Sequence, residues 1–143
     1  MAVGNVKESL NEPNRYLVPD SFERFLADLK GVARQERHPL INPKLFASAL
    51  SIDIQTLASQ AHVHRTTISR AQGAEKLQRY LRDALRVLGA AADINGDFHD
   101  ALFWFRNEPL SAFDYKTPEQ LVSEGRADDL LRYVQALQAG VVG

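Results

Sequence analysis

Residues 55–70 read QTLASQAHVHRTTISR, a stretch that predicts two short helices joined by a tight turn. Leu57, Ala58 and Ala61 fall at helical spacing on one face, as a short buried helix requires. Ala58 is small where two helices must cross closely, and Val63 in the turn is expected to point inward between them. The spacing is typical of a helix-turn-helix.

The second helix of the pair is expected to open at His64 or Arg65 and to be anchored by Ile68, its only large apolar residue. Its other positions carry hydrogen-bond donors, which can read base edges and phosphates in a DNA major groove. We therefore interpret residues 54–72 as a DNA-binding unit; the alternative is an ordinary packed helical hairpin. The predicted DNA-binding residues are His64, Arg65, Thr66, Thr67, Ser69 and Arg70.

The spacing L-A-x-x-A-x-V-x-x-x-T-I-S-R resembles the helix-turn-helix of Xre-type and related bacterial regulators. Those proteins usually have glycine where this chain has His62. The turn residue often needs a positive φ, which a non-glycine residue adopts only occasionally, although histidine is among the more tolerant. His62 is therefore the position at which the chain departs from the pattern.

The composition describes an ordinary globular chain of 143 residues, long enough for one domain or two small ones. There is no cysteine, which excludes a disulfide framework, a thiolate nucleophile and a cysteine zinc site. No apolar run approaches the roughly 20 residues of a membrane span. The N-terminus also lacks the order of a signal peptide. We expect a cytoplasmic protein with no membrane partner.

The net charge of −1 hides an uneven distribution of charge. Between residues 62 and 86, six Arg or Lys stand against two Asp or Glu, whereas between 93 and 129 nine Asp or Glu stand against three Arg or Lys. A basic centre and an acidic C-terminal third suggest two surfaces with two different partners. The alternative is that both are simply solvated faces.

Helical periodicity continues on both sides of the central stretch, and no segment alternates as a strand, so the expected fold is all-α. Upstream, one helix should begin near Asp20, where Asp20 and Glu23 have capping-box spacing. A second should begin at Pro43 with Asn42 as its cap. Downstream, a longer helix is expected over about residues 74–88.

Small polar residues at 90–96 suggest a junction between two subdomains. The predicted organisation is a flexible arm over 1–19, a helical region with the helix-turn-helix over 20–89, and a small helical domain over 90–143. The last of these should contain a short aromatic helix, a helix opened by Thr117-Pro118, and a final helix ending at Gly140.

The C-terminal part carries an ordered series of motifs: a tryptophan-bearing helix, a proline-containing loop before a leucine, a Thr-Pro helix start, a glycine that closes it and a final helix ending in glycine. The corresponding positions are Trp104, residues 107–110, Thr117-Pro118 with Leu121, Gly125, and residues 130–140. This series resembles the toxin-binding domain shared by the Xre, MbcA and ParS antitoxins. The chain departs from it at two places: the family's Pro-Asn order before the leucine is altered to Asn107-Glu108-Pro109, and the small residues often found before the Thr-Pro are replaced by Asp114-Tyr115-Lys116.

The resemblance implies an antitoxin paired with a RES-domain toxin, an enzyme that degrades NAD. Such an antitoxin blocks the toxin's active site and represses its own operon. Because one short helix reads few bases, we expect a homodimer on an inverted-repeat operator. An uncharged tail can enter an enzyme cleft, and isolated basic groups stand out on an acidic surface. The predicted toxin-binding residues are accordingly Arg106, Arg126, Gly140, Val141, Val142 and Gly143.

Two other functions remain open at this point. One is a conventional helix-turn-helix regulator whose C-terminal helices bind an effector or only dimerise. The other is an enzyme, for which His99 between Asp97 and Asp100 is the one candidate base or metal ligand. The four histidines are scattered and form no zinc-binding pair on a helix. We expect no catalytic residue, no metal, no cofactor and no small-molecule substrate.

Overall fold

A computed structural model of the chain describes residues 16–31 and 40–140. Within these ranges the regular structure is helical, apart from a single isolated antiparallel bridge. The all-α prediction is therefore confirmed for the described residues. Most of the arm predicted at the N-terminus lies outside them. The tail residues Val141, Val142 and Gly143 lie outside them as well.

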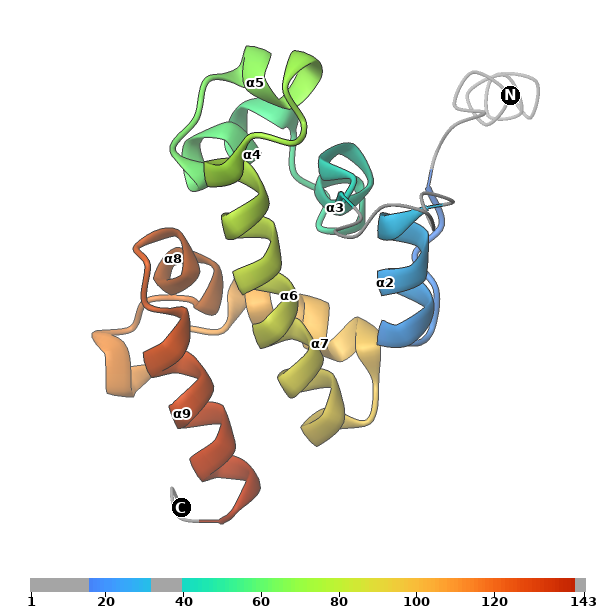
Figure 1. Ribbon diagram of the computed structural model, residues 1–143. Helices are drawn as coiled ribbons and strands as arrows, with labels where there is room; N and C mark the ends of the chain where they lie inside the picture. Colours follow the sequence, from blue (N-terminus) through green and yellow to red (C-terminus); the bar gives the residue numbers. More distant parts are fainter. Residues whose placement is uncertain (1–15, 32–39, 141–143) are drawn as a thin grey trace, which may run out of the picture.

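The central element is α6 (Glu75–Asn95), and α2 (Phe22–Lys30), α7 (Phe98–Asn107) and α9 (Ala127–Gln138) pack against it (Figure 1). The predicted leucine stripe of α6 is buried, and further buried side chains widen it so that the helix is covered on several sides. The buried positions are Leu77, Gln78, Tyr80, Leu81, Ala84, Leu85, Val87, Leu88 and Ala91.

α6 is longer than the sequence analysis predicted. We expected the helix to end near Leu88 and residues 90–96 to form a junction, but it continues to Asn95. Gly96 then ends it with a φ of 71°. The alanines that follow Gly89 favour a helix, and Ala91 is buried. The expected boundary at residue 90 thus falls inside a helix, and one hydrophobic core contains side chains from both sides of it.

Short elements make up the rest of the fold. They are α3 (Pro43–Ala49), α4 (Ile54–Ala61), α5 (Arg65–Arg70), the 3-10 helix η1 (Ser111–Phe113) and α8 (Pro118–Ser123). Asn42 and Thr117 cap α3 and α8 as predicted, and Thr117 forms a full capping box with Gln120. The cap predicted at Asp20 is wrong. Ser21 lies directly before the first helical residue, so its hydroxyl accepts a first-turn amide of α2 at 3.1 Å.

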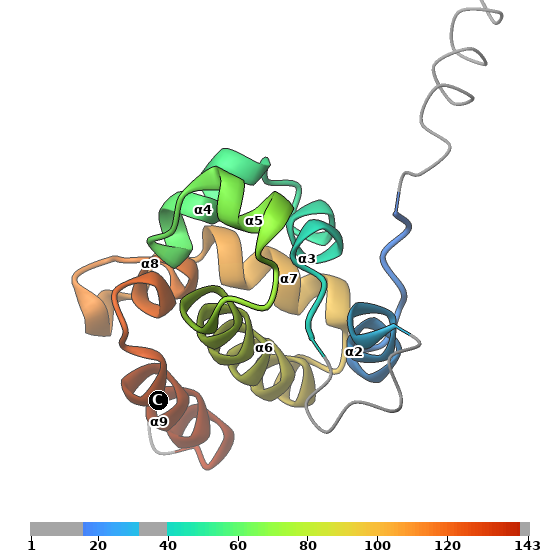
Figure 2. The same ribbon diagram turned by 45° about the horizontal axis from the view of Figure 1, so that its top comes forward.

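The helix pair α4–α5 and the end of α9 lie at opposite ends of the molecule (Figure 1). When the top of the molecule is turned forward, α8 is seen beside α4, between the helix pair and α9 (Figure 2). No helix in the described ranges is both long enough and apolar enough to cross a membrane.

A tight turn precedes α8 and carries two strained residues. Asp114 and Tyr115 have φ values of 56° and 64°, and the amide of Lys116 bonds to the carbonyl of Phe113 at 3.1 Å. Two central residues with positive φ define a type I′ turn, which favours glycine at these positions. Tyr115 nevertheless occupies one of them, with 69% of its surface exposed.

We predict that Tyr115→Gly stabilises the protein. The left-handed conformation costs a non-glycine residue about 1–2 kcal/mol of folding stability. Glycine avoids this cost, but it makes the unfolded chain more flexible, which lowers stability by about 0.4–1 kcal/mol. The free energy of unfolding should therefore rise by about 0.5–1 kcal/mol. Urea unfolding followed by circular dichroism measures it. The control is Ala112→Gly, at an exposed neighbour without positive φ, which should destabilise the protein. A lower free energy of unfolding in Tyr115→Gly would contradict the claim that the backbone at Tyr115 is strained.

Candidate nucleic-acid interface

The first helix of the pair, α4, forms as the sequence predicts. Asp53 caps it, because its carboxylate accepts the amide of Thr56 at 2.7 Å. Leu57, Ala58 and Ala61 are its buried residues and face the core. With two alanines among three buried positions, α4 can approach its neighbours closely.

The turn after α4 uses the backbone conformation that glycine usually supplies. His62 has φ 59° and ψ 42°, in the left-handed helical region. Its amide bonds back to the carbonyl of Ser59 at 3.2 Å, and the next amide, of Val63, bonds to that of Ala58 at 3.0 Å. Val63 is half-buried against the core, as predicted. The departure from glycine therefore leaves the turn geometry intact.

The second helix, α5, presents a polar outer face. Ile68 is completely buried and anchors the helix, as predicted. Among the residues predicted to bind DNA, only Thr67 is partly buried. The exposed ones are His64, Arg65, Thr66, Ser69 and Arg70. The structure thus brings the predicted donors together on one short helix and its cap.

The cations of α5 lack the ion pairs that engage the arginines of α6, and Arg24, Lys30 and Lys44 elsewhere on the described surface lack one as well. On α6, Arg82 lies 3.2 Å from Glu75, and Arg86 lies 3.2 Å from Asp83 and 3.1 Å from Asp128. By contrast, within the described ranges no ion pair involves Arg65, Arg70 or Lys76. Free cations beside exposed donors form a surface that suits a phosphate backbone.

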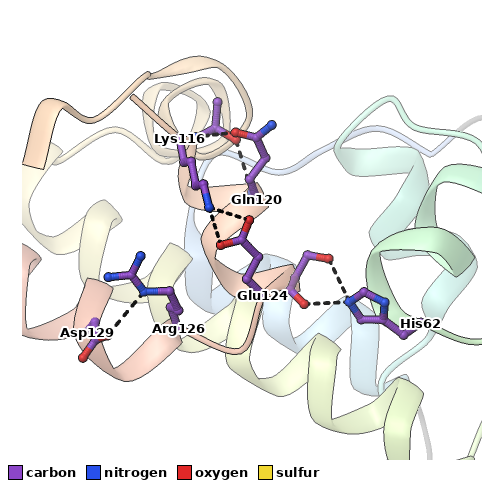
Figure 3. A network of polar contacts seen from close by, with 8 residues as sticks. His62, Lys116, Gln120, Glu124, Arg126 and Asp129 are labelled. Atoms are coloured by element: carbon purple, nitrogen blue, oxygen red, sulfur yellow. Dashed lines mark hydrogen bonds and ion pairs between the residues drawn. The ribbon is translucent and has the colours of Figure 1, made fainter. Parts of the chain in front are cut away.

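The helix pair is joined to the C-terminal helices through α8. The Nε2 atom of His62 lies 2.8 Å from the carbonyl oxygen of Ser123, the last residue of α8 (Figure 3). The hydroxyl of Ser123 donates to the carbonyl of Gln60 at 2.7 Å. These hydrogen bonds link residues more than sixty positions apart, and nothing in the local sequence around Gln60 or Ser123 indicated them.

Both ends of α8 are fixed by polar contacts of their own (Figure 3). Lys116 Nζ lies 2.9 Å from Glu124 Oε1, across the length of the helix. After α8, Arg126 pairs with Asp129 at 3.4 Å, and its guanidinium lies 5.1 Å from the ring centre of Phe113. The prediction that Arg126 is an isolated basic group is therefore wrong, because a carboxylate and an aromatic ring already hold it.

Arg106 is also engaged inside the protein. Its Nε lies 3.3 Å from Glu119 Oε2, and its Nη1 donates to the carbonyl of Leu50 at 2.8 Å. Glu119 is only 8% exposed, so the pair joins α7, α8 and α3 in a buried place. The prediction of an isolated surface cation at 106 is therefore wrong: the residue is drawn inward by a buried carboxylate that the sequence pattern did not reveal.

Burial dominates the electrostatics around Glu119. It raises the pKa of the Glu119 carboxyl above its ordinary value, while the charge of Arg106 and a hydrogen bond from Gln60 oppose the shift. The hydroxyl of Tyr80 donates to Gln60 Oε1 at 2.9 Å, and burial, followed by the charge of Glu119, raises the pKa of Tyr80. A polar network thus lies directly beneath α4.

The other predicted site residues lie apart from this network. Gly140 is exposed with a φ of 74°, just beyond the end of α9. Trp104 is half-buried and packs against the core. His99 is exposed and lies 3.2 Å from Asp20. In the described part of the chain, no three His, Asp or Glu side chains are placed to hold a metal ion.

The chain was compared with known proteins, and it matches no family model, no curated protein and no solved structure.

The raised pKa of Glu119 predicts a specific pH dependence. Because the folded carboxyl titrates above its ordinary value of 4.5, the folded state binds more protons between the two values. Folding stability attributable to this group therefore falls as pH rises through that window. Glu119→Gln removes this titration, so its stability relative to the wild type should increase as the pH is raised above 4.5.

Urea titrations of both proteins at several pH values measure this difference. The control is Glu108→Gln, since Glu108 is exposed and no ion pair is recorded for it in the described ranges. A stability difference between Glu119→Gln and wild type that is the same at every pH would show that burial does not perturb this carboxyl.

Proposed function

We propose that the chain is a DNA-binding protein whose reading element is α5. The observation that carries the proposal is the contrast between the two faces of this helix. Ile68 is buried completely, while the outer face presents exposed hydroxyl and guanidinium donors, and no ion pair within the described ranges involves Arg65 or Arg70. Such a face can place donors against base edges while its neighbours contact phosphates.

A homodimer on an inverted repeat follows from the size of the reading element. α5 has six residues and can contact only a few base pairs. Two copies one helical turn of DNA apart supply the remaining specificity. Because α5 lies at one end of the molecule, the opposite end at α9 stays available for another partner (Figure 1).

For that second partner we propose a RES-domain toxin that the chain neutralises, with repression of the shared operon through α5. The support is the motif series from Trp104 to Gly140 and its resemblance to toxin-binding domains of antitoxins. Since Arg106 pairs with the buried Glu119 and Arg126 is engaged by Asp129 at the surface, the contact is assigned to Gly140 and the residues that follow it. The protein in this proposal is an inhibitor and regulator, not an enzyme.

A second candidate function is a conventional regulator controlled by a small effector. The observation that favours it is a groove of about 990 Å³ between α2 and α6. Phe22, Leu26, Ile41, Leu85 and Ala90 contribute apolar lining to this groove. An apolar effector bound there should alter DNA affinity without any protein partner.

We predict that Arg70→Ala weakens binding to the DNA upstream of the gene. If Arg70 reads a guanine, the loss should be about 1–3 kcal/mol, or roughly fivefold to 150-fold in Kd. Fluorescence anisotropy titrations measure it. Arg132→Ala is the matched control, because it removes the same charge from an exposed position on α9. Equal losses in both variants would show a non-specific charge effect and remove α5 as the reading element.

We predict that deleting residues 140–143 abolishes protection against the product of the neighbouring toxin gene but leaves DNA binding intact. The tail has no charged side chain, so placing its side chains in a cleft carries little desolvation cost, and its loss should reopen the toxin's active site. Co-expression, with growth and cellular NAD as readouts, tests this. Full protection by the truncated chain would exclude the tail, and failure of the intact chain to co-purify with the toxin would exclude the antitoxin function.

A further inference from the structure

We propose that His62 is a positioning residue for the DNA-reading helix: its side chain holds the α4–α5 turn to the end of α8. The orientation of α5 then depends on α8 as well as on its own anchor. The inference rests on the proposed function, since it assigns a role in DNA reading. It gives a reason for histidine at position 62, where the helix-turn-helix pattern usually has glycine.

The first observation is that the backbone at position 62 would accept glycine more easily than histidine. With φ at 59° and ψ at 42°, this residue adopts a conformation in which a Cβ atom is crowded. The turn itself uses only backbone groups of His62 and Val63. The imidazole is therefore not needed to form the turn, and its contribution must come from a contact elsewhere.

The second observation is the direction of the contact with Ser123. A carbonyl oxygen only accepts, so Nε2 of His62 must carry the hydrogen and donate it across 2.8 Å. The Ser123 hydroxyl oxygen lies 3.4 Å from the same nitrogen and gives its own hydrogen to Gln60. Each residue of the contact also makes a second hydrogen bond to the end of α4: His62 through its amide to the carbonyl of Ser59, and Ser123 through its hydroxyl to the carbonyl of Gln60.

The third observation is that the carbonyl of Ser123, at the end of α8, needs a hydrogen-bond donor from outside its helix. The last carbonyls of a helix have no partner within it. The amides that follow α8 satisfy the carbonyls of Gln120, Leu121 and Val122. His62 satisfies that of Ser123, so one residue caps α4 with its backbone and α8 with its side chain.

The acceptor is also a firm reference point. Its helix opens with the capping box of Thr117 and is spanned by the ion pair between Lys116 and Glu124 (Figure 3). Beneath it, Glu119 pairs with Arg106. The imidazole ties the turn itself to this helix. Without it, the turn would be held by the packing of Val63 and Ile68 and by the Ser123–Gln60 hydrogen bond at the end of α4.

The test compares His62→Ala, which keeps a Cβ atom at the positive φ and removes the donor, with His62→Gln, which restores a donor of similar reach. DNA affinity is measured on the duplex upstream of the gene, and hydrogen exchange is measured at the amides of α5. For His62→Ala we expect binding about three- to tenfold weaker and exchange faster by a similar factor, the range of one net hydrogen bond. His62→Gln should recover most of both.

Ser51→Ala is the matched control, because Ser51 also has a positive φ (58°) in an exposed turn but no contact with α8 is recorded for it. It should change neither readout. Wild-type affinity and exchange in His62→Ala, or equal changes in His62→Gln and His62→Ala, would overturn the proposal. If the wild type fails to bind the duplex, the proposed DNA function fails, and the exchange data alone decide whether His62 restrains α5.

Discussion

The burial of α6 is the constraint on which the rest of the structure depends. Its apolar positions are too broadly distributed around the helix for one neighbour to cover, so helices from both ends of the chain pack against it. Fully burying one leucine stabilises a fold by about 1.5–3 kcal/mol, which makes separate N-terminal and C-terminal cores unfavourable here. The helix pair and the C-terminal helices therefore share one core.

That shared core determines where charge stays free. Arginines of α6 form ion pairs with carboxylates at the surface, and Arg106 pairs with the buried Glu119. Arg65 and Arg70 project from the short helix at the edge of the fold. A chain with a net charge of −1 can thus present a local basic surface, and that surface coincides with the donor-rich face of α5.

The elements that follow from local patterns were predictable from the sequence. The caps at Asn42, Asp53 and Thr117, and the buried anchor Ile68, each depend on residues within one or two turns of a helix. The end of α6 was not, because a run of alanines is compatible with a helix and with a junction until its packing is known.

The partners of Arg106 and His62 were equally hidden from sequence reasoning. Each lies across a separation of many residues, and a single glutamate or serine carries no local signal of a tertiary contact. The two contacts share one element. α8 packs against both α7 and α4, and it supplies the partner of a polar side chain on α7 and of another at the end of α4.

Mapping the DNA contact on the protein tests the central claim most directly. A titration of the isotopically labelled chain with the upstream duplex, followed by amide chemical shifts, reports every affected residue at once. We predict shift changes concentrated in α5, its cap at His64 and the start of α6, with the amides of α9 unchanged. Shift changes concentrated in α9, or none at saturating duplex, would contradict the assignment of α5 as the reading helix.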